Sequence, residues 1–125
     1  MHSVVISGTG LYQPPHTITN AELVESFNRY VDLQNAQHAT EIAAGTREPL
    51  QHSSVEFIEK ASGIKQRYVL EKSGILDPTR MYPRLQERPD DQLSLMGEFA
   101  VAASQQALQQ AGKTGADIDG VLVIP

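Results

Sequence analysis

The chain of 125 residues contains no cysteine and no tryptophan. Without cysteine, these residues form no disulfide, no cysteine-ligated zinc or iron–sulfur site, and no thiol nucleophile. A basic excess is also absent, since ten Lys and Arg stand against fifteen Asp and Glu, for a net charge of −5. A nucleic-acid-binding surface needs clustered basic residues, so we expect no nucleic-acid partner.

Long apolar runs are missing as well. Residues 1–8 have no basic region ahead of their short apolar run and do not resemble a secretory signal. No apolar stretch approaches the roughly 20 residues of a membrane-spanning helix. We therefore expect no membrane association and a cytoplasmic location. The 40% of hydrophobic residues are enough for a core, and the length allows one domain.

The histidines show no spacing typical of a metal site. None has a histidine four residues away, and none is spaced with carboxylates as metal ligands are. We expect surface histidines and no bound metal. The residues concerned are His2, His16, His38 and His52.

Two patterns admit a phosphate-binding interpretation. Gly8-Thr9-Gly10 follows an apolar segment, but Gln13 stands where the dinucleotide-binding turn needs its third glycine. A tight turn is therefore the favoured interpretation. Three arginines recur at a spacing of four, for which a solvated face is favoured and phosphate contact is the alternative. They are Arg80, Arg84 and Arg88.

The order of predicted strands and helices indicates an α/β fold. Strands are predicted over residues 3–8, 64–70 and 120–125. The last is a continuous apolar run after a glycine, typical of a buried parallel strand. Such a strand seldom ends a chain, and we expect this sequence to be part of a longer one.

Capping residues predict the helices. Thr19 or Asn20 begins the first, and Glu22 completes a capping-box pattern with Thr19. A helix over about 92–111 has a small apolar face, which predicts close packing on a sheet or another helix. Asp90 or Asp91 is its expected cap, and Gly112 its end. Shorter helices are predicted from Ser53 or Ser54 to Gly63, and for a turn or two before Gly45.

Phe57 lies on the polar side of its predicted helix, away from Val55, Ile58 and Ser62. An aromatic ring at such a position either packs beneath the irregular residues that precede the helix or stacks on a flat ligand. The physics alone favours packing.

Four segments resemble, in order, the β-ketoacyl-acyl-carrier-protein synthase III enzymes of the thiolase superfamily. They are residues 3–14, Thr19-Asn20-Ala21-Glu22-Leu23, residues 57–68, and residues 94–98 with 116–123. Residues 57–68 are similar to the family pattern W-I-x-x-R-T-G-I-x-x-R-[HY]. The resemblance covers residues 1–125 apart from insertions at about 28–52 and 71–90. It implies a thiolase-like α/β fold, of which this chain is part of the N-terminal half, and a homodimer.

The resemblance implies a decarboxylative Claisen condensation. An acyl group passes from acyl-CoA to a cysteine, and malonyl-acyl-carrier protein then loses CO₂ and attacks the thioester. The family's catalytic cysteine, histidine and asparagine correspond to positions beyond Pro125. The resemblance therefore implies no catalytic residue and no cofactor in this chain, which we expect to be inactive without the remainder of its own chain.

Three residues carry over to coenzyme A binding by the resemblance. Phe57 stands where the family has a tryptophan that stacks on the adenine, and Ser53 stands near a hydroxyl that contacts it. Ala61 replaces a family arginine, and the hypothesis is that Lys65, beside Arg67, compensates for it. Alternatives are a related synthase of the quinolone, olefin or hydroxymethylglutaryl-CoA type, and a non-catalytic module that pairs with a catalytic subunit.

Overall fold

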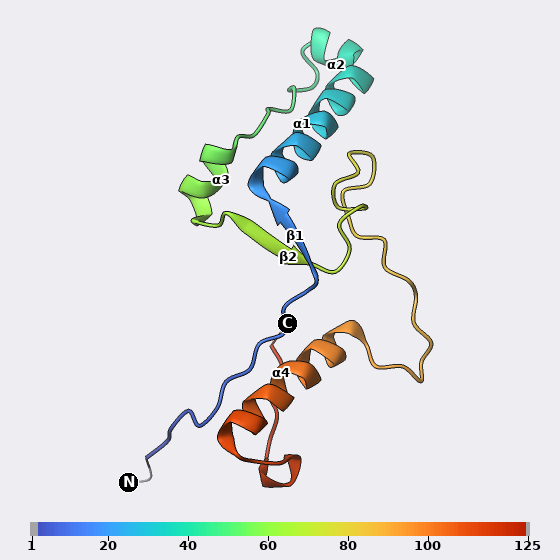
Figure 1. Cartoon of the computed structure of the whole chain (residues 1–125). Helices are drawn as coiled ribbons and strands as arrows, with labels where there is room; N and C mark the ends of the chain where they lie inside the picture. Colours follow the sequence, from blue (N-terminus) through green and yellow to red (C-terminus); the bar gives the residue numbers. More distant parts are fainter. Residues whose placement is uncertain (1–2, 125) are drawn as a thin grey trace. The chain divides into compact units, whose positions relative to one another are not determined.

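A computed structural model describes residues 3–124 of the chain (Figure 1). The chain divides into two compact units: a central unit of residues 14–86, and a terminal unit in which residues 3–13 join residues 87–124. The central unit contains β1 (His16–Thr19), α1 (Asn20–Gln37), α2 (Ala39–Ala43), α3 (Val55–Ser62) and β2 (Gln66–Val69). The terminal unit contains α4 (Leu95–Ala111) and the 3-10 turn η1 (Gly115–Asp117). No helix in residues 3–124 is both long and apolar enough to cross a membrane.

The central unit is built on a two-stranded sheet. β1 pairs antiparallel with β2, with His16 opposite Val69 and Thr19 opposite Gln66. Ile18 on β1 is 1% exposed, and Val31 on α1 is fully buried. The helices α1, α2 and α3 lie between the two strands in the sequence (Figure 1). This mixture of helix and sheet is compatible with the α/β class.

The strands predicted over residues 3–8 and 120–124 are absent from the described part of the chain. Val4 and Ile6 are 95% and 87% exposed, and Leu122 is 84% exposed. A strand exists only where its N–H and C=O groups pair with a neighbouring strand. Neither segment has such a partner within residues 3–124, so an apolar run alone was the wrong basis for these two predictions. Residue 125 of the predicted last strand lies outside the described residues.

The capping predictions are largely confirmed. The Thr19 hydroxyl accepts from the N–H of Glu22, whose side chain accepts from the N–H of Thr19. One cap was wrong: α4 begins after Ser94, whose hydroxyl accepts from the N–H of Gly97, and not after Asp90 or Asp91. The glycines that end the helices adopt the left-handed conformation that residues with a Cβ disfavour. They are Gly45, Gly63 and Gly112.

Gly8 and Gly10 serve a close approach and not the predicted tight turn. A Cβ on Gly8 would lie 2.2 Å from the carbonyl oxygen of Ala107, and one on Gly10 would lie 1.8 Å from that of Ala103. The small face of α4 therefore packs on an extended segment instead of the expected sheet or helix. The side-chain carbonyls of two α4 residues accept backbone N–H groups of this segment: Gln110 from Thr9 at 2.6 Å, and Gln106 from Leu11 at 3.0 Å.

The irregular residues after β2 are organised by one carboxylate. Glu71 accepts hydrogen bonds from the hydroxyl and N–H of Ser73 and from the N–H groups of Gly74 and Arg84. The hydroxyl of Ser73, and then the N–H of Arg84, hold the pKa of Glu71 at about 2 instead of 4.5. The same segment reaches α1, where the buried Ser26 hydroxyl donates to the carbonyl of Leu76 at 2.9 Å.

We expect acid to destabilise the segment that follows β2. Because the pKa of Glu71 falls from 4.5 unfolded to about 2 folded, its stabilising contribution is complete above about pH 4.5 and is lost towards pH 2. Lys72, followed by Thr19, lowers the pKa of Glu22 to about 2 as well, over the same range. We expect the free energy of unfolding, measured by urea titration, to fall across this range, and Glu71→Gln to reduce the fall. An unchanged acid dependence in Glu71→Gln would contradict the assignment.

Candidate functional site: two adjoining hollows

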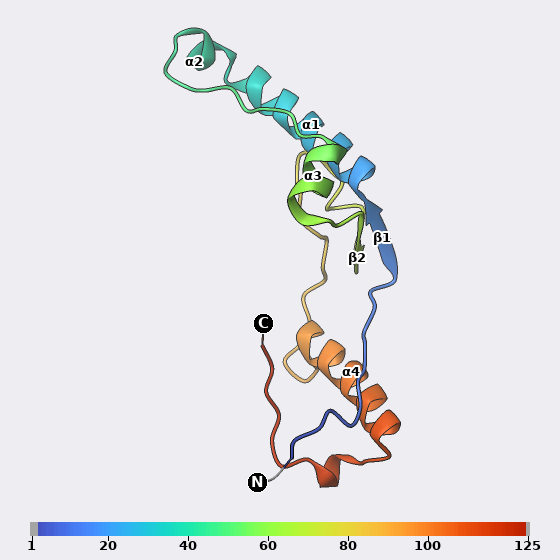
Figure 2. The ribbon, with the colours of Figure 1, turned by 90° about the vertical axis from the view of Figure 1, so that its left-hand side faces the viewer.

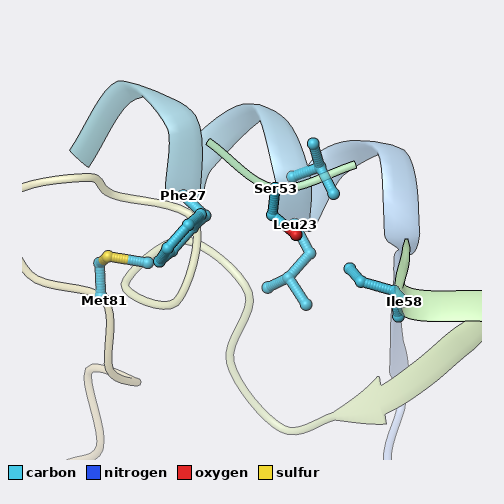
Figure 3. A pocket seen from close by; sticks show the side chains of 6 residues that line it. Leu23, Phe27, Ser53, Ile58 and Met81 are labelled. Carbon is cyan, nitrogen blue, oxygen red and sulfur yellow. The ribbon is translucent and has the colours of Figure 1, made fainter. Parts of the chain in front are cut away.

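Two hollows in the central unit share Phe27 and Ser53. The inner hollow, of about 270 Å³, has nearly apolar walls. Its lining residues are Leu23, Val24, Phe27, Ser53, Ile58 and Met81 (Figure 3). The outer hollow, of about 410 Å³, combines two aromatic rings with polar groups. Its lining residues are Phe27, Gln51, His52, Ser53, Ser54 and Phe57.

The apolar face of α1 forms the floor of the inner hollow. Leu23 and Phe27 lie four residues apart, so their side chains point to the same side of the helix. Ile58 comes from α3, and the side chain of Met81 extends towards the ring of Phe27 (Figure 3). The apolar side chains of α1 therefore border a space as well as contributing the buried Val31 to the core.

Met81 lines the inner hollow from a strained backbone position. Its φ of 57° lies in the left-handed region, which residues other than glycine seldom occupy. Its N–H donates to the carbonyl of Asp77 at 2.9 Å. The neighbouring Arg80 lies 4.0 Å over the ring of Tyr82 and donates to that residue's carbonyl. These contacts on both sides of Met81 hold the backbone in place.

The start of α3 positions the outer hollow. Asn28 on α1 accepts from the N–H of Ser53 at 2.8 Å and donates to its carbonyl at 3.1 Å. The next residue, Ser54, caps α3, and its hydroxyl accepts from the N–H of Phe57 at 3.1 Å. The favoured prediction for Phe57 was wrong, because the ring is not packed beneath the preceding residues but is 66% exposed. It lies at the edge of the outer hollow.

The structure brings together two of the three residues predicted for coenzyme A. Ser53 and Phe57 both line the outer hollow, whereas Lys65 is an exposed residue between α3 and β2 and lines neither hollow. Arg67, the other cation of that pair, donates to the side chain of Asn20 at 3.1 Å. Among the other lining residues, Phe27 had no predicted role in binding, and His52 was expected only at the surface.

The three arginines spaced by four residues form no common helical face. Arg84 pairs with Asp77 at 2.6 Å, and Arg88 pairs with Glu98 at 2.8 Å. Arg80 is the residue stacked on Tyr82. Each guanidinium is already engaged within its own unit. In the described part of the chain, no three metal-ligating side chains come together as a metal site.

The chain is similar in sequence to a known synthase. It is 58% identical, over 100 residues, to the beta-ketodecanoyl-[acyl-carrier-protein] synthase of Pseudomonas aeruginosa, and these residues are 80% of the chain. The match spans 29% of that relative's own length. No family profile matches the chain. The resemblance to β-ketoacyl-acyl-carrier-protein synthases, predicted from four short motifs, is confirmed by this similarity.

Proposed function

We propose that this chain is the N-terminal part of a β-ketoacyl-acyl-carrier-protein synthase and forms one wall of its acyl-CoA site. The observation that carries this proposal is the 58% identity to a β-ketodecanoyl synthase. The proposal includes the thiolase-like fold, a cytoplasmic homodimer, and no cofactor beyond the substrates. Since the chain has no cysteine, the nucleophile is supplied by residues outside this sequence.

The reaction we propose joins an acyl group to malonyl-acyl-carrier protein. The thiolate of that outside cysteine takes the acyl group from acyl-CoA and releases CoA. Malonyl loses CO₂, and the resulting carbanion attacks the acyl thioester, forms the new carbon–carbon bond and frees the cysteine. A β-ketodecanoyl product has ten carbons, two of which come from malonyl. An eight-carbon acyl-CoA is therefore the donor that we propose.

The assay uses the whole protein that carries this sequence, with octanoyl-CoA and malonyl-acyl-carrier protein. The expected product is β-ketodecanoyl-acyl-carrier protein, identified by its mass, together with one CO₂ per turnover. Release of CoA without carbon–carbon bond formation would contradict a condensing function. Condensation with acetyl-CoA in preference to octanoyl-CoA would contradict the chain length.

Phe57, Ser53 and Lys65 are the residues that we propose for coenzyme A. Support for Phe57 and Ser53 comes from the hollow that they share, with an exposed ring able to stack on a base. Lys65 is supported by the resemblance and by its exposed position. The part of acyl-CoA that we propose for this hollow is its nucleotide.

Replacement of Phe57 tests this assignment. Stacking of a base on an aromatic ring contributes about 1–3 kcal/mol, so we expect Phe57→Ala to raise the KM for acyl-CoA by about tenfold or more. The maximal rate should stay near that of the parent protein, because the ring is remote from the reacting carbons in this proposal. Phe57→Trp, which restores the family residue, serves as the control and should keep the parent KM. An unchanged KM in Phe57→Ala would exclude stacking at this position.

A further inference from the structure

A polar ladder on α1 holds the segment that returns from α2. Asn28, Asp32 and Asn35 are spaced by four and three residues and so share one face of the helix. Asn35 donates to the carbonyl of Leu50 and accepts from its N–H, both at 2.9 Å. Asn28 makes the same pair of bonds with Ser53. Figure 2 shows the returning segment running alongside α1.

Asp32, between the two asparagines, holds His52. Its carboxylate oxygen lies 2.7 Å from Nε2 of the imidazole ring. Within residues 3–124 no hydrogen bond reaches the other ring nitrogen, Nδ1. Since His52 lines the outer hollow beside Phe57, the ladder fixes one nitrogen of the ring and leaves Nδ1 for a ligand.

The ion pair of Asp32 and His52 contributes little to the stability of the fold. The two side chains are 55% and 67% exposed, and exposed ion pairs contribute about 0–1 kcal/mol to stability. The two asparagines already secure the backbone on either side of His52, with two hydrogen bonds each. Fixing an exposed imidazole at the edge of an aromatic hollow therefore points to binding.

We infer that His52, positioned by Asp32, is a specificity-determining residue that hydrogen-bonds the base of the nucleotide in acyl-CoA. This inference rests on the proposed function. Phe27 and Phe57 offer flat apolar surfaces for a heterocycle, and the edge of a purine carries donors and acceptors that an imidazole nitrogen can meet. The residues inserted before α3 thus supply one wall of the base site.

Calorimetric binding of coenzyme A and of pantetheine, which lacks the nucleotide, tests this inference on the whole protein that carries the sequence. His52→Asn keeps a polar atom near the position of Nδ1, whereas His52→Gln keeps one near Nε2 and loses the one near Nδ1. We expect His52→Gln to weaken coenzyme A binding by about fivefold, the effect of one hydrogen bond, and His52→Asn to retain most of the affinity. Pantetheine binding should be the same in both variants.

Two further variants separate a binding role from a structural one. Asp32→Asn should weaken coenzyme A binding less than His52→Gln, because it leaves the imidazole present but less firmly oriented. Glu41→Gln, in an exposed ion pair with Arg47 away from both hollows, is the matched control and should change nothing. Equal weakening of coenzyme A and pantetheine by His52→Gln would show a structural role and overturn the inference.

The failure of the inference is distinguishable from the failure of the proposed function. If His52→Gln binds coenzyme A normally while Phe57→Ala does not, the base site stands and the role of His52 is wrong. If the parent protein binds no coenzyme A, or if Phe57→Ala binds it normally, the proposed base site is wrong and the inference falls with it.

Discussion

We expect Gly10→Ala to lower the free energy of unfolding of the terminal unit more than an alanine at any other glycine of that unit. The new Cβ would lie 1.8 Å from the carbonyl oxygen of Ala103 and 2.8 Å from its carbonyl carbon. These are backbone atoms of α4 and cannot rotate away, so the extended segment has to leave the helix. Overpacking typically costs 1–3 kcal/mol, and we expect a loss of about 3 kcal/mol in the free energy of unfolding.

Urea unfolding, followed by the helical circular dichroism signal, measures this loss. The matched control is Gly115→Ala, since a Cβ on Gly115 meets nothing within 4 Å and its backbone is not left-handed. We expect that control to change the free energy of unfolding by less than about 0.5 kcal/mol, as surface substitutions do. Equal stability of Gly10→Ala and Gly115→Ala would show that the segment does not press on α4.

Ile18→Ala should have an effect of similar size in the central unit. Ile18 is 1% exposed and lies on β1, and Val31 is the other apolar side chain of the described residues that is buried to this degree. A core this small cannot close the space left by three lost carbons without moving a strand or a helix. Isoleucine-to-alanine changes in cores cost 2–5 kcal/mol, and we expect about 3 kcal/mol here.

The same deletion at an exposed site provides the comparison. Ile64 is 43% exposed, so Ile64→Ala removes identical atoms from a position that buries much less of them. We expect Ile64→Ala to lower the free energy of unfolding by less than about 1 kcal/mol. If the two variants are equally stable by urea titration, Ile18 is not the centre of the core.

The parts of the fold that the sequence predicted are those decided by neighbouring residues. The capping box of Thr19 and Glu22 involves three residues of separation, and the left-handed Gly63 needs only its own backbone. The start of α4 was misplaced because Asp90, Asp91 and Ser94 are all good N-cap residues. Composition alone cannot choose among them, and the choice depends on which residues follow.

The other differences between prediction and structure arise from contacts between residues that are distant in the sequence. An apolar run predicts a strand only if a partner strand is at hand, and for residues 3–8 and 120–124 the described chain holds none. The two glycines at positions 8 and 10 suggested a turn, because the contact that requires them lies about 95 residues away on α4.

In the candidate site too, features set by neighbouring residues were predicted, and those set by distant residues were not. The polar-side position of Phe57 was visible in its helical spacing, whereas the role of His52 depends on Asp32, twenty residues earlier in the chain. A signal was present nonetheless: Asn28, Asp32 and Asn35 form a polar stripe on a helix whose other face is apolar. A solvated helix face shows the same pattern, so the stripe alone does not identify the segment that covers it.

Asn35 joins the two ends of the loop that leaves α1 and returns to it. Asn35 ties itself to Leu50, and the hydrogen bonds of the turn between them stay local, such as those joining Thr46 to Glu41. Residues 36–49 therefore form a loop that is closed at its base by Asn35 and Leu50. The length of this loop does not affect the residues that line the outer hollow. We expect duplications, deletions or a grafted epitope in this loop to leave the hollow intact, so a fluorescent label can be attached there.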